Sequence, residues 1–300
     1  MMTAVTERTA GLGTPTCVRR LGLATLVANI GIVITGGAVR LSGSGLGCPT
    51  WPRCTDESFT PHGALDLHSA IEFGNRTLTF VLITIALATF LSALNTGRAD
   101  LRKLAVLLGL SVPAQALLGG VTVLTGLNPW VVAFHLLFSM GIISLAVLYL
   151  HRTDHPAVPK VEERAPASVS KPRHLILAWS TYAAAWVVLA LGTVVTGSGP
   201  HAGDAEAPRN GLDPLQLSQL HADFVFLLVG LTVALVIVHP SRATWTLLAV
   251  ELGQGLIGFV QYVTDLPVVL VAFHLLGASL VAATVTWVVI EVREGYARRT

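Results

Sequence analysis

The chain contains eight apolar segments separated by short polar stretches. A helix needs about 20 apolar residues to cross the roughly 30 Å of hydrocarbon in a bilayer. Charged residues make up only 12% of the sequence, against about 25% in soluble domains. The sequence therefore predicts an all-α integral membrane protein with eight transmembrane helices. The predicted spans are 20–41, 70–95, 103–124, 131–150, 174–196, 216–238, 244–263 and 267–290.

The positive charges are sorted between the two sides of these spans. Of the 19 lysines and arginines, fifteen fall on the side of the two termini and of the polar stretch 151–173, and four (Arg40, Arg53, Arg76 and Arg209) fall on the other. Such residues mark cytoplasmic segments, so we expect a multi-pass protein of the cell membrane with both termini in the cytoplasm. The net charge of +2 gives no reason to expect a nucleic-acid partner, and lipid is the expected surrounding.

The sequence Val-Ala-Phe-His-Leu-Leu occurs twice, at 132–137 and at 271–276, a spacing of 139 residues. Because each half has an even number of predicted spans, the two copies point the same way across the membrane, as in a parallel repeat. We expect two parallel-repeat four-helix bundles, at 1–150 and 174–300, joined by the Pro-, Lys-, Glu- and Ser-rich linker 151–173. The matches extend upstream through Gln115, Leu117, Gly119, Val121, Thr125 and Leu127, which recur as Gln254, Leu256, Gly258, Val260, Thr264 and Leu266.

Four histidines follow this repeat. His135 and His274 lie within the two copies, and His68 and His221 open the second and sixth spans. An ionisable residue at membrane depth is a functional hypothesis by default. Each predicted bundle thus offers two histidines on different helices, the axial-ligand arrangement of a six-coordinate haem. The alternative is that each histidine is a satisfied residue near the membrane interface, but their repeated placement favours haem binding.

Glu72 and Arg76 lie four residues apart in the second span. In one interpretation they form an i,i+4 ion pair that neutralises itself. In the other, Glu72 is a proton acceptor or charge stabiliser beside a reacting group. The sixth span has no carboxylate at the equivalent depth, since Asp223 lies nearer the surface. The two halves therefore differ in chemistry, and one site is expected to hold a cofactor and the other a substrate.

The loop 40–54 is dense in glycine and proline and contains Cys48 and Cys54. On the outer side of a membrane a disulfide can form and persist. Such a disulfide is either a structural link within the loop or a redox-active pair, and the sequence leaves both open. Arg40 and Arg209 are expected to pair with haem propionates, because guanidinium groups suit carboxylates.

Several of these motifs together resemble those of haem A synthases, most of all the actinobacterial type. The similarity covers nearly all of the membrane portion. It implies an enzyme that converts haem O to haem A for cytochrome c oxidase, by oxidising the C8 methyl of the porphyrin to a formyl group through successive hydroxylations. The motifs that carry the resemblance are at 36–49, 71–76, 119–126 and 195–201.

The resemblance also implies roles for individual residues. The C-terminal half would hold a haem b cofactor between His221 and His274, and the N-terminal half would receive haem O on His135. Glu72 matches the glutamate important for activity in the family. Arg76 and Arg40 are expected to contribute to haem binding. Cys48 and Cys54 match the outer cysteine pair of the family.

One position departs from the family pattern. Where the second span commonly reads Glu-x-x-His-Arg, this chain has Asn75 in place of the histidine. Either His68 supplies the ligand, or His135 alone holds the substrate haem. The offset of 153 residues between His68 and His221 resembles the spacing of the repeat and favours His68.

The expected partners are the haem O substrate, haem O synthase or oxidase assembly factors, and an electron acceptor that the sequence does not identify. Two alternatives from other classes are a di-haem b membrane electron carrier that oxidises quinol, and a transporter. Glu72 occurs in only one half, which favours the enzyme over a carrier with symmetric sites. The transporter would require broken helices at equivalent places, and Pro113 has no counterpart.

Overall fold

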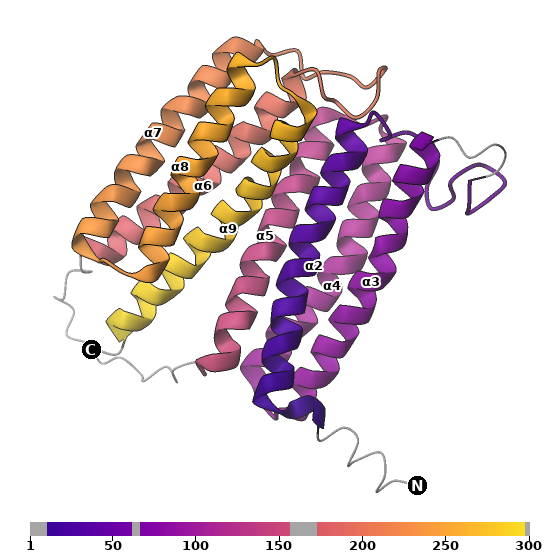
Figure 1. Ribbon diagram of the computed structural model, residues 1–300. Coiled ribbons are helices and arrows are strands. Elements are labelled where there is room, and N and C mark those ends of the chain that lie inside the picture. The colour runs from indigo at the N-terminus through magenta and orange to yellow at the C-terminus, as the bar shows by residue number, and fades with distance from the viewer. Residues whose placement is uncertain (1–10, 62–66, 157–172, 298–300) are drawn as a thin grey trace, which may run out of the picture.

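The computed structural model of the protein describes residues 11–61, 67–156 and 173–297, which are helical apart from the connecting loops (Figure 1). Most of the predicted linker 151–173 lies outside these residues. A short 3-10 helix, η1 (Gly11–Gly13), is followed by α2 (Pro15–Leu41), α3 (Leu67–Asn95), α4 (Ala99–Leu124), α5 (Pro129–Asp154), α6 (Arg173–Ser198), α7 (Pro214–Val238), α8 (Arg242–Val263) and α9 (Val268–Ala297).

Within the described residues, α2 to α9 are the eight helices long and apolar enough to cross a membrane, so the predicted all-α, eight-span fold is confirmed. The helices run past the predicted apolar segments, because backbone hydrogen bonding continues into polar flanking residues. α5, predicted at 131–150, starts at Pro129 and ends at Asp154. Its start is fixed by Asn128, whose side chain accepts a hydrogen bond from the Trp130 N–H, with proline in the first turn.

The helices form two groups of four (Figure 1). In the first group α2 contacts α3, α3 contacts α4, α4 contacts α5, and α5 returns to α2. In the second group α6, α7, α8 and α9 close in the same order. The groups meet where α5 contacts α6 and α9, and where α2 contacts α9. The domain limits and the parallel-repeat relation between the two halves stay predictions.

Backbone geometry recurs at the spacing of the sequence repeat. Leu127, between α4 and α5, and Leu266, between α8 and α9, have φ angles of 59° and 57°. Such left-handed backbone is uncommon for leucine. The Leu127 N–H donates to the Thr122 carbonyl and the Leu266 N–H to the Gln261 carbonyl, both at 2.8 Å. The matching residues of the two copies therefore form the same tight turn.

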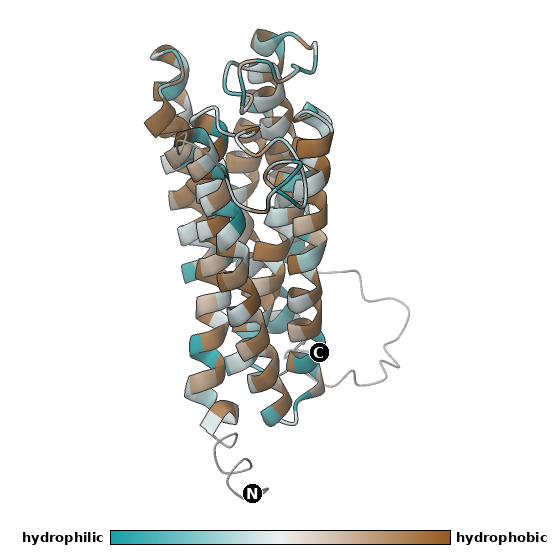
Figure 2. Ribbon diagram, turned by 90° about the vertical axis from the view of Figure 1, so that its right-hand side faces the viewer, coloured by the Kyte–Doolittle hydropathy of each residue, from teal (hydrophilic) through white to brown (hydrophobic). Residues whose placement is uncertain are grey.

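The two ends of the bundle differ in character. We call the end that carries Cys48 and Cys54 the disulfide end, and the opposite end, where α2 begins and α9 ends, the basic end. At the basic end Arg19 bonds Asp154 at 3.1 Å, joining α2 to α5, and Arg152 bonds Glu294 at 2.7 Å, joining α5 to α9. Apolar residues dominate the length of the helices between these ends (Figure 2).

Large apolar side chains are exposed on the outer faces of the helices, as expected where lipid replaces water. Examples are Phe80, Phe226, Ile237 and Leu256, each at least 65% exposed. The contact between the two groups of helices is apolar and buried. Its fully or nearly buried members are Val33, Met140, Ile143, Leu189 and Ala282.

Candidate functional site

Two of the predicted haem ligands face each other in the second group of helices. The rings of His221, on α7, and His274, on α9, have centroids 6.5 Å apart and planes inclined by 75°. Glycines on the neighbouring helices leave room for both rings. A Cβ atom at Gly192 of α6 would lie 3.2 Å from Cε1 of His221, and one at Gly258 of α8 would lie 3.2 Å from Cε1 of His274.

This pair has the properties expected of axial ligands to an iron porphyrin. Two imidazoles that share one ion through metal–nitrogen bonds of about 2 Å would have ring centroids roughly 6–6.5 Å apart. The Nδ1 atoms of both histidines are buried without a hydrogen-bond partner. Across the described residues, no group of three or more His, Cys, Asp or Glu side chains is placed to hold a metal ion. A metal at this pair would therefore need most of its ligands from elsewhere, as a porphyrin supplies them.

The backbone of α9 is held at this point by α8. Nε2 of Gln254 donates a hydrogen bond of 2.8 Å to the carbonyl oxygen of His274. In the first group of helices Gln115 donates to the His135 carbonyl at 3.3 Å, and it also bonds the Ser139 hydroxyl. These glutamines are 139 residues apart, so the hydrogen bond to the histidine carbonyl recurs at the spacing of the sequence repeat.

His135 matches His274 in its surroundings, but within the part of the chain that the structure describes no second imidazole ring is in contact with it. A Cβ at Gly119 would lie 3.4 Å from its Cε1 atom, and its Nδ1 is buried without a hydrogen-bond partner. His68 is exposed, and its Nδ1 bonds the Ser44 hydroxyl at 3.0 Å. Among the described residues no ring contact joins His68 to His135. The structure thus brings together two of the four predicted ligands and leaves His135 as a single inward histidine.

Asn75, which replaces the histidine of the family pattern, takes a structural role in the first group. Its Oδ1 accepts a hydrogen bond of 2.8 Å from the Thr35 hydroxyl of α2. The residue therefore ties α3 to α2.

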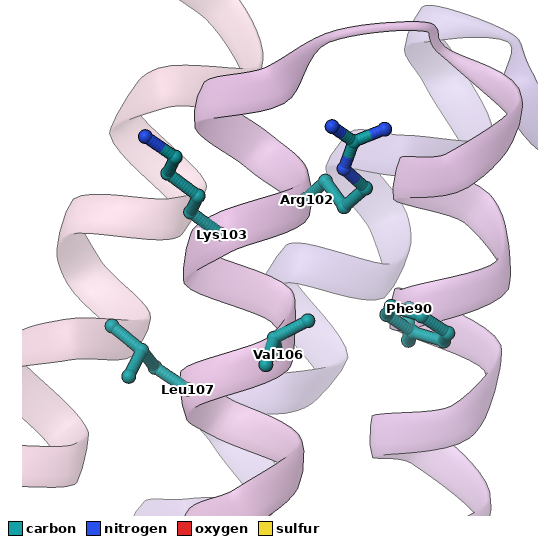
Figure 3. A pocket seen from close by; sticks show the side chains of 5 residues that line it. All are labelled: Phe90, Arg102, Lys103, Val106 and Leu107. Carbon is teal, nitrogen blue, oxygen red and sulfur yellow. The ribbon is translucent and has the colours of Figure 1, made fainter.

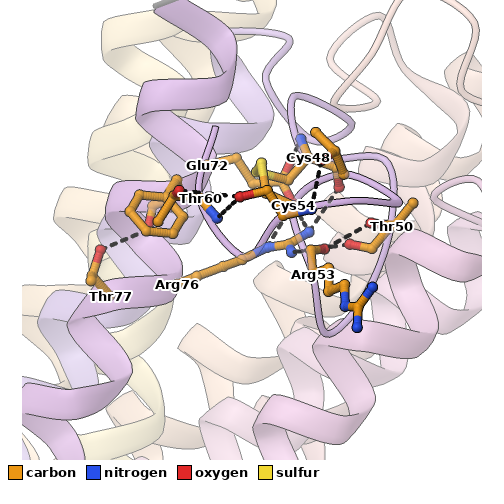
Figure 4. The surroundings of a disulfide bond; sticks show 11 residues. Cys48, Thr50, Arg53, Cys54, Thr60, Glu72, Arg76 and Thr77 are labelled. Carbon is orange, nitrogen blue, oxygen red and sulfur yellow. Dashed lines mark hydrogen bonds and ion pairs between the residues drawn. A yellow bond between two sulfur atoms is a disulfide. The ribbon is translucent and has the colours of Figure 1, made fainter. Parts of the chain in front are cut away.

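Glu72 and Arg76 form the ion pair expected from their spacing, and both hold the disulfide loop (Figure 4). Cys48 and Cys54 are bonded, with an S–S distance of 2.01 Å, which confirms the predicted disulfide. The Arg76 Nη2 donates to Glu72 Oε1 at 2.5 Å, and the backbone N–H of Cys48 donates to Glu72 Oε2 at 2.6 Å. Glu72 is 5% exposed, so both oxygens of a buried carboxylate are satisfied.

The guanidinium of Arg76 is also committed to this loop. It donates to the backbone carbonyls of Cys48, Thr50 and Arg53 at 2.8–3.1 Å (Figure 4). Its three nitrogens all have partners within the protein. The contacts of Arg76 are those of a residue that positions Glu72 and the loop.

Arg40, predicted to meet a haem propionate, joins the two halves of the chain through hydrogen bonds, and its role toward a propionate stays a prediction. Its Nε donates to the His201 carbonyl at 2.6 Å, and its Nη2 donates to the Thr196 carbonyl at 3.1 Å. Arg209 donates to the carbonyls of Ala207 and Pro200 in the same loop. His201, in the same loop, also contacts the second copy of the repeat, since its Nε2 bonds the Leu266 carbonyl at 2.9 Å.

Glu251, in the middle of α8, is not among the predicted site residues. It is 3% exposed, and its Oε1 accepts a hydrogen bond of 2.8 Å from the Thr232 hydroxyl of α7. The sequence does contain a signal for Glu251, because a carboxylate within a membrane span is itself a reason to expect function.

A pocket at the basic end lies apart from the histidines. Its lining residues belong to α3 and α4 and include no residue of the candidate site (Figure 3). They are Phe90, Arg102, Lys103, Val106 and Leu107.

Residues 19–211 match the model of the COX15-CtaA family, described as cytochrome oxidase assembly protein. The chain belongs to this family. The matched stretch contains His68, His135, Glu72 and the disulfide loop, so the resemblance found in the sequence motifs is confirmed.

Curated relatives are named heme A synthase. The one from Bacillus licheniformis is 33% identical over 133 residues, covering 43% of this chain and 42% of the relative. The one from Shewanella oneidensis is 32% identical over 144 residues, covering 43% of each. The one from Staphylococcus epidermidis is 24% identical over 273 residues, covering 85% of this chain and 88% of the relative. The more similar stretches therefore span less than half the length of those relatives.

Proposed function

We propose that this protein is a haem A synthase of the cell membrane, which oxidises the C8 methyl of haem O to a formyl group through successive hydroxylations for cytochrome c oxidase. The observation that carries the proposal is the facing pair His221 and His274 in a member of the COX15-CtaA family. The relatives named heme A synthase support it.

In this proposal His221 and His274 hold haem b as the resident cofactor. Held between these two histidines, haem b would supply one-electron transfer, which could carry electrons away from the methyl group. Gly192 and Gly258 leave room for the rings, and Gln254 fixes the backbone turn that presents His274.

The first group of helices receives haem O as substrate. His135 is its iron ligand, because His68 is exposed and bonded to Ser44. Oxidation of the methyl group breaks C–H bonds, releasing protons and passing electrons to the electron acceptor, so a base beside the reacting carbon assists the reaction. Glu72 takes one such proton, while Arg76 and the Cys48 N–H hold its carboxylate in one orientation.

The distribution of charge supports the orientation in the membrane. The basic end, with Arg19, Arg98 and Arg152, faces the cytoplasm together with both termini. The disulfide end then faces outward, where oxidising conditions keep Cys48 and Cys54 bonded. Haem O synthase and oxidase assembly factors are the proposed protein partners.

The test is to express the protein with a supply of haem O and to separate the extracted haems by chromatography. We expect haem A or its hydroxylated intermediate from the unchanged protein, loss of both products in Glu72→Gln, and loss of haem b in His274→Ala. Glu57→Gln is the matched control, because Glu57 is an exposed carboxylate of the same outer loop. If only haem b is recovered whether or not Glu72 is present, the protein is an electron carrier and the proposal fails.

A further inference from the structure

Glu251 is a buried carboxyl group that the proposed reaction does not use. One of its oxygens, Oε1, accepts the hydrogen bond from Thr232 at 2.8 Å. The other, Oε2, is buried and has no hydrogen-bond partner. Burial of an incompletely bonded carboxyl group within a membrane span is costly, so its presence calls for a reason other than packing.

The sequence repeat shows that the fold itself does not need this group. The position 139 residues earlier, on α4, is Val112. An apolar side chain therefore serves at the equivalent place in the first half. The carboxyl group is found only in the half that holds the facing histidines.

Glu251 is on the helix that supports His274. Gln254, which bonds the His274 carbonyl, is three residues further along α8, on the same face. Gly258, which borders the His274 ring, is seven residues from Glu251, or about 10 Å along the helix axis.

The other ionisable groups on the two helices packed against α8 lie toward its ends. On α7 and α9, the site histidines and Asp223 lie nearer the disulfide end, and Arg293 and Glu294 lie at the basic end. His239, which caps α7, and Glu291 of α9 approach each other at 3.7 Å at the basic end. Within the described parts of these three helices, Glu251 is thus the carboxyl group at middle depth.

We propose that Glu251 is a redox-linked proton-binding residue, which takes up a proton when an electron reaches the iron held by His221 and His274 and releases it when the electron leaves. This inference rests on the proposed haem b site. With haem b held there, a one-electron donor would supply the electron to this site, and the Glu251 carboxylate would bind a proton from the solvent. On oxidation the electron would pass to the acceptor and the proton would return to the solvent.

The physical cause is compensation of charge in a medium of low dielectric constant. An electron added about 10–15 Å away, at an effective dielectric constant of about 20, changes the proton affinity of a carboxylate by about tenfold. Proton uptake at Glu251 offsets part of the negative charge added to the membrane interior. Electrons taken from the substrate methyl group can then pass through the second half with less charge accumulating there.

The test is a redox titration of the haem-loaded protein at several pH values. In the unchanged protein we expect the midpoint potential to fall as pH rises, by a total of about 59 mV for a tenfold coupling of one electron. In Glu251→Gln the potential should not change across the same pH range. Glu291→Gln, which removes a carboxylate at the basic end, is the matched control and should keep the dependence.

Infrared difference spectra between the oxidised and reduced states report the carboxyl group directly. We expect a protonated carboxyl C=O band to appear on reduction, to be retained in Glu291→Gln and to be absent in Glu251→Gln. If the unchanged protein binds haem but shows a pH-independent midpoint potential and no such band, the role of Glu251 is overturned and the proposed cofactor site is not. A protein that binds no haem between His221 and His274 overturns the proposed cofactor site as well.

Discussion

The backbone N–H of Cys48 donates a 2.6 Å hydrogen bond to Oε2 of Glu72. The disulfide loop and the buried carboxylate of α3 are therefore a single hydrogen-bonded unit. Arg76 completes it, since it bonds both Glu72 Oε1 and the Cys48 carbonyl. Whether the disulfide is a structural link or a redox-active pair, this backbone contact is a route by which we expect a change in its state to affect Glu72.

Replacement of Arg76 by methionine should expose the disulfide to reductants. The variant loses the hydrogen bonds to the Cys48, Thr50 and Arg53 carbonyls, and a bond to a charged donor contributes about 1.5–3 kcal/mol. We expect the Cys48–Cys54 bond to be reduced at least about tenfold faster. The rate is measured by labelling the released thiols with a maleimide during mild reduction.

The matched control is Arg53→Met, which removes a guanidinium from the same loop. Arg53 is exposed, bonds the Asp56 carbonyl at 3.0 Å and lies over the ring of Phe59. Neither of these side-chain contacts involves Glu72, so loss of the Arg53 side chain should leave the reduction rate nearly unchanged. Equal rates in the two variants would show that Arg76 does not secure the loop.

Valine at Gly258 should weaken haem binding between His221 and His274. Its Cβ would lie 3.2 Å from Cε1 of His274, and the two further methyl groups would push the ring from its position. Overpacking of this kind costs about 1–3 kcal/mol, or a roughly five- to hundredfold loss of affinity. The affinity is measured by titration of the haem-free protein with haem b, followed in the absorption spectrum.

Gly255→Val is the control on the same helix, because nothing lies within 4 Å of a Cβ at that position. Gly119→Val is a second control, since it crowds His135 in the other half. Both variants should bind haem b as the unchanged protein does. A similar loss of haem affinity in Gly255→Val would show that the effect comes from the change in helix propensity from glycine to valine and not from crowding of the His274 ring.

The transmembrane fold follows closely from the sequence. Eight apolar segments are long enough to span a bilayer, and in lipid each must satisfy its backbone hydrogen bonds as a helix. The predicted boundaries differ from the structure at the helix ends, because backbone hydrogen bonding continues beyond the last apolar residues. α9, predicted to end at residue 290, continues to Ala297. The turns at Leu127 and Leu266 also follow the sequence repeat, because they depend on local residues.

The candidate site was predictable only in part. His221, His274 and Glu72 stand out because an ionisable residue within an apolar span is rare. The partners of Arg40 were not predictable, since the Thr196 and His201 carbonyls are more than 150 residues away in sequence. The expected pairing of His68 with His135 depended on how the start of α3 is oriented, and a single sequence does not specify that orientation.

Arg40→Met should destabilise the protein even without haem. The variant loses two hydrogen bonds from a charged group to the carbonyls of Thr196, in the last turn of α6, and His201, in the loop that follows. These bonds hold α2 to this part of the second half. We expect a loss of about 1–3 kcal/mol, seen as a lower thermal midpoint of the haem-free protein in detergent. Arg20→Met is the control, because Arg20 is exposed at the basic end. If Arg40→Met has the same thermal midpoint as the unchanged protein and loses only haem affinity, Arg40 binds a propionate instead.

Labelling of one introduced free cysteine at a time in intact cells should reveal which end of the bundle faces outward. In a Cys17→Ala background, Arg20→Cys places a thiol at the basic end and Glu206→Cys places one at the disulfide end, both at exposed positions. Because positive residues are retained in the cytoplasm, a membrane-impermeant maleimide should label only Glu206→Cys. After the cells are opened, both variants should react, which shows that each thiol is accessible. Labelling of Arg20→Cys in intact cells would reverse the orientation and would place the Cys48–Cys54 disulfide in the reducing cytoplasm, where such bonds rarely persist.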